Sequence, residues 1–262
     1  MNIPRPVRRF AERCSRHVFL TRRLPARFGA LRLRLSPGAS LVYYLGLRQR
    51  NFGDLYDFAE HYVHPGQTVW DVGGNMGVFS FAAAARAQAA GRVLCLEPDF
   101  WSVRLLRRSC ELNRGRAAPV DVLPVAISDR VSIESLNIPE HGRAATHLAI
   151  AGGAGENIVG AVREQHLTMT VTLDWLGEHY PPPQCIKIDV DGAEYRVLSG
   201  GRALIERHRP VILTEVYERN AESVSAFFHA LGYELFDFNC GEAGKRPVER
   251  AVYNTLAQPR QP

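Results

Sequence analysis

Apolar and polar positions alternate along the chain in a pattern typical of an α/β protein. Short apolar runs of strand length, such as TVWDV (68–72), RVLCLEP (92–98) and CIKIDV (185–190), are separated by longer segments with an apolar stripe at helical spacing. Two of the predicted helices are VFSFAAAARAQAA (78–90) and WSVRLLRRSCELN (101–113). Strands separated by helices of this length indicate βαβ units and a mostly parallel sheet.

The remaining apolar runs extend this sheet to seven strands. VDVLPVAIS (120–128) and PVILTEV (210–216) continue the parallel set, and a single long helix is predicted over 193–208. YELFDF (233–238) and VYNTLA (252–257) follow each other without a long helix between them, which indicates an antiparallel edge. We therefore expect an α/β fold with a mostly parallel seven-stranded sheet, helices on both faces and an antiparallel edge strand.

Two segments depart from this pattern. Residues 129–170 combine short strand-like pieces with a glycine-rich loop, AGGAGE (151–156), which predicts an inserted hairpin or lid rather than a βα unit. Residues 1–36 are expected to form an arginine-rich N-terminal extension. The predicted division is thus an extension over 1–36 and a folded domain over 37–262 that carries a variable insert at about 129–170.

The positive charge of the chain is concentrated in this extension. The formal net charge is +5, and the ten arginines of residues 1–34 face a single acid, Glu12, so the remaining residues are net acidic. A solvated helix, a membrane-surface helix and a patch that binds an anionic substrate all fit such a segment. No aromatic-interleaved basic face or known motif supports binding to nucleic acid.

Cysteine usage and hydropathy predict a cytoplasmic protein. The five cysteines are scattered and form no C-x-x-C pair, which argues against a disulfide framework or a structural zinc site. No apolar run reaches the roughly 18–20 residues needed to cross a bilayer. The N-terminus also lacks the apolar core and cleavage site of a signal peptide.

Glycines and carboxylates gather at the predicted carboxyl ends of the strands, which is where ligands bind in doubly wound sheets. The strand over 68–72 runs directly into the sequence DVGGNMG. The residues of interest are Asp71, Gly73, Gly74, Asn75 and Gly77 after the first strand, Glu97, Pro98 and Asp99 after the second, Ser128 and Asp129 after the third, Asp189, Asp191 and Glu194 after the fourth, and Glu215 after the fifth.

The glycine-rich turn and the acid after the second strand suit a nucleoside ligand. Glycines let the backbone bend sharply under a ligand, and the helix that follows presents its N-terminal N–H groups. Glu97 lies twenty residues beyond Gly77, a spacing at which a carboxylate can take ribose hydroxyls. The dinucleotide fingerprint G-x-G-x-x-G is not met, because position 72 is valine. The pattern D-x-G-x-N-x-G instead resembles the first motif of methyltransferases that use S-adenosylmethionine.

Several blocks in succession resemble the FkbM-family methyltransferases. VWDVGGNMGVFSF, GRVLCLEPDF, VAISD, TLDWL and IKIDVDGAEYRVLSGG followed by RPVILTEV occur in the family's order over about residues 37–257. Two departures are Gly74, where the family often has alanine, and Asp191, where it often has glutamate. The resemblance implies a class I (Rossmann-like) methyltransferase fold, S-adenosyl-L-methionine as cofactor and S-adenosyl-L-homocysteine as product.

The resemblance also implies the cofactor-binding residues. In such motifs the first acid, here Asp71, contacts the methionine amino group, and the second-strand acid, here Glu97, pairs with the ribose. The full expected set is Asp71, Gly73, Gly74, Asn75, Gly77, Glu97, Pro98, Ser128 and Asp189.

Asp189, Lys187 and Glu215 are the candidate catalytic residues. Methyl transfer to a hydroxyl needs a group that positions the acceptor oxygen and withdraws its proton, and we assign this role to Asp189. Lys187 shares a strand face with Asp189 and could pair with a carboxylate, while Glu215 ends the adjacent strand. Asp189 could instead serve only the turn. A divalent cation on Asp189, Asp191 and Glu215 is a further alternative that we do not favour, because methyl transfer does not require one.

Three further residues are weaker candidates. His141 and His147 could act as bases, although a solvated loop position is expected for both. Tyr217 could line the acceptor pocket or simply pack in the core.

The sequence therefore predicts a methyltransferase domain over 37–262 that methylates a hydroxyl oxygen. The expected acceptors are a sugar, a glycolipid or a polyketide-type molecule of natural product biosynthesis. An N-methyltransferase of the same fold, a NAD- or nucleotide-binding Rossmann protein without methyl transfer, and a non-catalytic scaffold stay open as alternatives. We expect a small-molecule or glycan- or lipid-linked acceptor as partner, no nucleic acid, and peripheral membrane contact through the extension as one option. The oligomeric state is open, and a dimer would be compatible.

Overall fold

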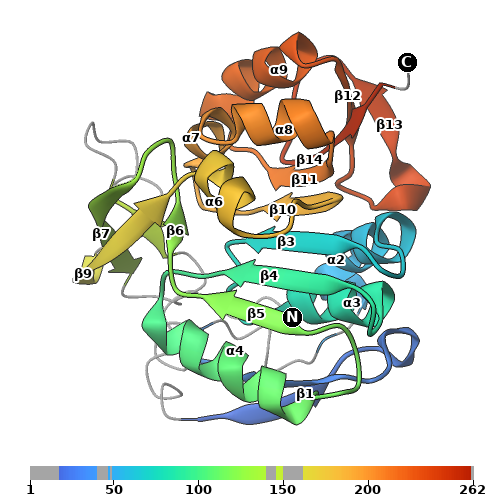
Figure 1. Cartoon of the computed structure of the whole chain (residues 1–262), viewed down its shortest axis with the longest axis vertical. Coiled ribbons are helices and arrows are strands. Elements are labelled where there is room, and N and C mark those ends of the chain that lie inside the picture. The colour runs from blue at the N-terminus through green and yellow to red at the C-terminus, as the bar shows by residue number, and fades with distance from the viewer. Residues whose placement is uncertain (1–17, 40–46, 48, 140–145, 150–161, 261–262) are drawn as a thin grey trace.

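The structure is a computed structural model that describes residues 18–39, 47, 49–139, 146–149 and 162–260. Its largest feature is a mostly parallel sheet with helices on both faces (Figure 1). From one edge to the other its strands are β13 (Arg246–Val248), β12 (Tyr233–Asp237), β14 (Asn254–Pro259), β11 (Val211–Glu215), β10 (Cys185–Ile188), β3 (Thr68–Val72), β4 (Arg92–Leu96) and β5 (Val120–Leu123). The predicted α/β architecture is confirmed.

The five strands from β11 to β5 run parallel, and β10 lies between β3 and β11. In this register Lys187 of β10 is opposite Asp71 of β3. Because parallel strands end at the same edge of a sheet, Gly73, Asp189 and Glu215 reach that edge next to one another. The three strand ends that the sequence singles out are therefore adjacent in space.

Two layers of helices bury both faces of the sheet. The core on one face includes Phe58, Phe79 and Leu106, and the core on the other face includes Trp70 and Phe228. Burial on both faces explains why the strands are continuous apolar runs rather than alternating ones. The helices of the first layer are α2 (Gln49–Tyr62), α3 (Val78–Ala87) and α4 (Phe100–Leu112), and those of the second are α6 (Leu173–His179), α7 (Glu194–Ser199), α8 (Arg202–His208) and α9 (Ala221–Ala230).

The sheet differs from the predicted one in strand number and in the place of its antiparallel strand. It has eight strands rather than seven, because the short strand β13 adds to the edge next to β12. The last strand, β14, is antiparallel but lies inside the sheet, between β11 and β12. The antiparallel edge strand is β13 instead. Its three residues, Arg-Pro-Val, carry little apolar signal of their own.

Two further breaks interrupt runs that the sequence analysis treated as single elements. The run 120–128 is divided by Pro124 into β5 and β6 (Ala126–Ile127), which belong to different sheets. The run 193–208 is divided into α7 and α8 by Gly200 and Gly201. A Cβ at Gly200 would overlap the carbonyl oxygen of Ser128, so the helix pair packs directly onto the chain that leaves β6.

A second, four-stranded sheet lies at the carboxyl ends of the parallel strands (Figure 1). Its strand order is β6, β9 (Val162–Val171), β7 (Ser132–Pro139) and β8 (His147–Leu148). β7 and β9 pair antiparallel along most of their length, with a register shift between Ile138 and Pro139. We refer to these strands as the insert sheet.

The described part of the N-terminal segment packs against the main domain. β1 (Leu20–Arg23) and β2 (Arg32–Leu35) form an antiparallel ribbon that contacts α4. The backbone N–H of Arg32 donates to the side chain of Asn113, and that of Arg34 donates to Ser109. The domain boundary at residue 36 stays a prediction. Within the described ranges, no helix combines the length and the apolar character needed to cross a membrane.

Candidate active site

The loop between β3 and α3 depends on its glycines because it passes very close to two strand ends. Gly73 has a positive φ of 79°, and a Cβ there would overlap the carbonyl oxygen of Asp189. A Cβ at Gly74 would overlap the sulfur of Cys95 on β4. Gly77 begins α3 with a φ of 82°. The glycines thus first of all let the loop lie against β10 and β4, which places its backbone at the site.

Lys187 joins this loop to the end of β10. Its ammonium group donates to the carbonyl oxygen of Gly73 at 2.8 Å and lies 3.4 Å from Asp71 Oδ1 and 3.2 Å from Asp189 Oδ2. Burial disfavours the charged form of Lys187, but the carboxylates of Asp189, Asp71 and Glu215 outweigh it and raise its pKa. Asp71 is fully buried, and its Oδ2 accepts a hydrogen bond of 2.5 Å from Ser80. Lys187 therefore acts as a buried cation between two carboxylates.

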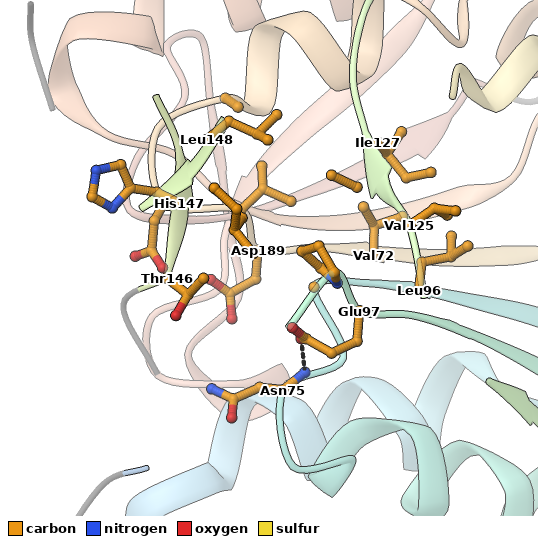
Figure 2. Close-up of a pocket in the computed structure, with 17 residues that line it drawn as sticks. Val72, Asn75, Leu96, Glu97, Val125, Ile127, Thr146, His147, Leu148 and Asp189 are labelled. Atoms are coloured by element: carbon orange, nitrogen blue, oxygen red, sulfur yellow. Dashed lines mark hydrogen bonds between the residues drawn. The ribbon is translucent and has the colours of Figure 1, made fainter. Parts of the chain in front are cut away.

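Glu97 follows β4 and is held by two backbone groups. Its Oε2 accepts from the N–H of Asn75 at 2.7 Å, and its Oε1 accepts from the N–H of Asp99 at 2.8 Å (Figure 2). Burial raises the pKa of Glu97 to about 7, although these hydrogen bonds favour the charged form. The carboxylate is thus fixed in orientation, and each oxygen keeps a lone pair for a ligand.

An apolar cavity opens beside Glu97, between the main sheet and the insert sheet (Figure 2). Glu97, Asn75 and Asp189 line it together with residues of the insert sheet. We refer to it as the apolar cavity. It is lined by Val72, Gly73, Asn75, Leu96, Glu97, Pro98, Val125, Ala126, Ile127, Leu136, Thr146, His147, Leu148, Asp189, Val190, Asp191 and Ala193.

A second cavity adjoins it on the side of α2. Asn75 and Asp189 line both cavities, so these two residues mark the place where the cavities meet. The second cavity, which we call the acidic cavity, is lined by Phe52, Asp54, Leu55, Asp71, Gly74, Asn75, Val78, Phe79, Lys187, Asp189 and Glu215.

Neutral hydrogen-bond donors hold three of the carboxylates in this region. Glu215 accepts from the hydroxyl of Tyr253 at 2.5 Å, and Asp191 accepts from the hydroxyl of Tyr217 at 3.1 Å. Asp54 accepts from the side-chain amide of Asn254 at 3.1 Å. Burial raises the pKa of all three acids, and the charge of Asp189 raises them further. Such groups are typical of functional sites.

The structure brings most of the expected site residues together. Gly73, Asn75, Glu97, Pro98 and Asp189 line the apolar cavity. Four other expected residues near the strand ends line the acidic cavity, namely Asp71, Gly74, Lys187 and Glu215.

Two expected cofactor-binding residues line neither cavity. Ser128 is buried, and its hydroxyl donates to Asp129 at 3.2 Å. Gly77 lies beneath the loop, where a Cβ would come within 3.0 Å of Phe81 and Leu106. A role for either residue at a ligand stays a prediction.

Glu194 closes the turn after β10. It accepts from the N–H of Gly192 at 2.6 Å and from the side-chain amide of Asn220 at 2.7 Å. Asp191 in this turn has a positive φ of 51°, and Gly192 has a φ of 104°. The D-x-D-G-A-E sequence thus forms a tight turn that Glu194 stabilises, while Asp189 is left at its start.

Asp54 and the contribution of β8 to the site were not predicted from the sequence. Asp54 lies on α2 within an ordinary helical pattern, so no local signal marks it. Thr146, His147 and Leu148 form one wall of the apolar cavity. His147 is buried there rather than solvated as expected. His141 lies outside the described residues.

The described part of the chain contains neither a disulfide nor a cluster of metal ligands. Cys95, Cys110, Cys185 and Cys240 are free thiols. Among the residues that the structure describes, no three His, Cys, Asp or Glu side chains are arranged to hold a metal ion.

This fold and site define the class of protein. A parallel sheet with a glycine-rich loop after its first central strand, an acid after the next one and an antiparallel strand inside its far half is the class I fold of S-adenosylmethionine-dependent methyltransferases. The model of the FkbM methyltransferase domain matches residues 71–239, well over half of the chain. The chain belongs to this family, as the sequence motifs predict.

Solved structures agree with the fold. An FkbM methyltransferase from Methylobacillus flagellatus is 14% identical, with a TM-score of 0.52; the match covers 84% of this chain and 52% of that one. The chain thus spans about half the length of that protein. A precorrin-6y C5,15-methyltransferase from Geobacter metallireducens (12% identity, TM-score 0.46, coverage 81% and 89%) and an O-methyltransferase from Thermotoga maritima (13%, 0.45, 80% and 66%) are also similar. A search of curated protein sequences found no significant match.

Proposed function

We propose that this protein transfers a methyl group from S-adenosylmethionine to a hydroxyl oxygen of a sugar, glycolipid or polyketide-type acceptor. The observation that carries the proposal is the junction of the two cavities at Asp189 and Asn75. One cavity suits a nucleoside, and the other contains carboxylates suited to binding a polar acceptor.

The described residues fit the cofactor. Asn75 Oδ1 is a buried atom that accepts no hydrogen bond from any described residue, and Asp71 Oδ1 has only its ion pair with Lys187. Both residues line the acidic cavity. Buried polar atoms without a partner are rare, so a ligand with donor groups is the natural partner here. We assign the adenine to the apolar cavity, the ribose hydroxyls to Glu97, and the amino group of the methionine portion to Asp71.

Asp189 is the proposed base. When bound, S-adenosylmethionine supplies a sulfonium methyl group that an acceptor oxygen can take by in-line displacement. The Asp189 side chain is 32% exposed, so an acceptor hydroxyl can reach it and give up its proton there. Lys187 holds the Asp189 carboxylate from its buried side. Glu215 is a second carboxylate that lines the acidic cavity.

Two alternatives differ from the proposal in measurable ways. An N-methyltransferase of the same fold would use the same cofactor but a nitrogen acceptor. A NAD- or nucleotide-binding protein would bind NAD or a nucleotide and would transfer no methyl group. The valine at position 72 counts against the dinucleotide alternative, because that fold's fingerprint needs glycine there.

The arginine-rich N-terminal segment bears on the choice of acceptor. We propose that the arginine-rich N-terminal segment helps to bind an anionic or membrane-linked acceptor in the cytoplasm. Five of its arginines lie within the described residues, and Arg27 forms an ion pair of 3.1 Å with Glu60. If the segment binds an anionic acceptor, added salt should raise the apparent KM for it, whereas a neutral acceptor should show little change.

The test is a transfer assay with S-adenosylmethionine that carries a labelled methyl group. Sugars, glycolipids and polyketide-type alcohols are offered beside matched amines, and products are located by mass spectrometry. Asp189→Asn should lower the transfer rate about 100-fold or more while S-adenosylhomocysteine still binds. Asp121→Asn is the matched control, because Asp121 contacts Tyr180 on the surface. Transfer to amines alone would support the nitrogen alternative. A binding titration in which NAD binds and S-adenosylmethionine does not would overturn the proposal.

A further inference from the structure

We propose that the acidic cavity distinguishes ligands by charge, so that Glu215 and Asp54 make the cationic methyl donor bind more tightly than its neutral thioether product. This inference rests on the proposed function and concerns the same site. It assigns a role to two carboxylates that the proposed chemistry does not use as the base.

The cavity gathers acids from four different elements around one cation. Asp54 comes from α2, Asp71 from β3, Asp189 from the end of β10 and Glu215 from β11. Lys187 is the one cation among the residues that line this cavity. Asp191 lies just beyond Asp189, close enough for its charge to raise the pKa of Glu215. The formal charge of the described wall is therefore strongly negative.

Lys187 does not neutralise all of these acids. It lies within ion-pair distance of Asp71 and Asp189. Glu215 instead accepts from the neutral hydroxyl of Tyr253, and Asp54 from the neutral amide of Asn254. No cation of the described residues lies within ion-pair distance of either acid. Glu215 and Asp54 are thus half-buried carboxylates whose charge is balanced only at longer range.

The raised pKa values of Glu215 and Asp54 agree with this arrangement. The charged groups that face Glu215 are Lys187, Asp189 and Asp191, and those that act on Asp54 are Asp189 and Lys187. Burial, and then the repulsion from Asp189, raise the pKa of both acids. A bound positive charge would lower these pKa values again and would release protons. Asn75 also lines this cavity, and its buried Oδ1 accepts no hydrogen bond from any described residue, which independently indicates a ligand at this place.

The two forms of the cofactor differ by one unit of charge at sulfur. Both carry the same adenosine, amino group and carboxylate, so the ratio of their affinities isolates the contribution of the sulfonium. At an effective dielectric constant of about 20, unit charges roughly 10 Å apart interact strongly enough to change an affinity about tenfold. Loss of the neutral product is then easier than loss of the donor, which would limit product inhibition.

The charge of the cavity can also stay constant through the reaction. The acceptor O–H bond breaks and an O–C bond forms, while the C–S bond breaks and leaves its electron pair on sulfur. The sulfonium charge disappears, and the acceptor proton passes to Asp189. With the cation gone, Glu215 and Asp191 favour their protonated forms again and can share this proton before it reaches solvent.

The test is isothermal titration calorimetry with three probes and no acceptor. The probes are S-adenosylmethionine, S-adenosylhomocysteine and sinefungin, which carries an amine where the donor has its sulfonium centre. The wild-type protein should bind the donor and sinefungin about tenfold or more tightly than S-adenosylhomocysteine at about pH 8.5, with a smaller ratio at about pH 6.5. Buffers of different ionisation enthalpy should show proton release with the two cationic probes only.

The variants are Glu215→Gln and Asp54→Asn, and the matched control is Glu222→Gln on the exposed face of α9. Each site variant should weaken donor binding about tenfold at about pH 8.5 and leave S-adenosylhomocysteine within about twofold. The control should leave both affinities unchanged, and thermal midpoints show that the variants are folded. Equal losses for donor and product, or equal wild-type affinities for the two, would overturn the charge proposal while leaving the proposed function intact. Failure of all three probes to bind would instead contradict the proposed function.

Discussion

Gly73 lies directly against the carbonyl group of Asp189, with no room between them for a side chain. The contact ties the loop after β3 to the end of β10, which is the place where both cavities meet. Gly73→Ala should therefore move the loop as well as strain its backbone. We expect a loss of about 3 kcal/mol or more in the free energy of unfolding, and no detectable binding of S-adenosylhomocysteine.

Gly66→Ala separates these two effects. Gly66 also has a positive φ, of 85°, but no atom lies within 4 Å of a Cβ built there. Its substitution should cost only the backbone strain, about 1 kcal/mol, and leave cofactor binding intact. Chemical denaturation and calorimetry measure both quantities. Equal costs at the two glycines would show that the contact with Asp189 does not matter.

Lys187→Met should destabilise the protein strongly, because it leaves Asp71 buried without its cation. Breaking a buried ion pair from one side costs roughly 3–5 kcal/mol. Lys245→Met is the matched control, since the Lys245 pair with Glu242 is partly exposed and worth at most about 1 kcal/mol. Urea denaturation of both variants measures the two losses, and equal losses would contradict the role of Lys187 as the buried partner of Asp71.

Glu97→Ala should abolish the stabilisation that S-adenosylhomocysteine gives. At about 100 times its Kd, a ligand that binds only the folded state adds about 2.7 kcal/mol, an easily measured rise in Tm. Glu97 offers the carboxylate that we assign to the ribose, and its orientation is fixed by the backbone of Asn75 and Asp99. Glu111→Ala on the surface of α4 should keep the full shift. A normal shift in Glu97→Ala would remove the ribose assignment.

The cofactor-free protein should lose stability as the pH rises from about 6 to about 8.5. Burial raises the pKa of Glu97 from 4.5 to about 7, so the folded protein binds more protons than the unfolded chain in this range. The stability that this group contributes is complete below about pH 4.5 and is lost as the pH passes through 7. Asp54, Asp191 and Glu215 act in the same direction.

Glu97 alone accounts for about 1 kcal/mol between these two pH values, or a few degrees in Tm. Differential scanning fluorimetry without ligand measures the change. Glu215→Gln should flatten the dependence, whereas Glu222→Gln on the surface should not. A Tm that rises over this pH range would contradict the assignment of buried acids with raised pKa values.

The sequence predicted the parallel half of the sheet and most of the site because both depend on local signals. The strand TVWDV and the loop that follows it are legible from apolar length and from glycine spacing. The breaks at Pro124 and at Gly200 were not recognised, because they depend on which sheet the chain joins and on what Gly200 packs against. The place of β14 inside the sheet is likewise a matter of pairing, which apolar periodicity does not encode.

The parts of the site that escaped prediction come from elements remote in sequence. Asp54 reaches the acidic cavity from α2 and is held by Asn254 of β14. His147 becomes a wall residue only because β8 pairs with β7. Lys187 was expected to pair with one carboxylate, and the register between β10 and β3 gives it a second partner, Asp71. Such contacts follow from topology, so no motif in the sequence reveals them.

The sequence contains only two lysines, and their surroundings differ in a useful way. The amine of Lys245 is partly exposed, whereas that of Lys187 is almost completely enclosed by the loop and the two carboxylates. An acylating reagent should therefore label Lys245 quickly and Lys187 only when the loop after β3 moves away from β10. Peptide mass spectrometry of the two sites over time would turn Lys187 into a built-in reporter of how often the active site opens.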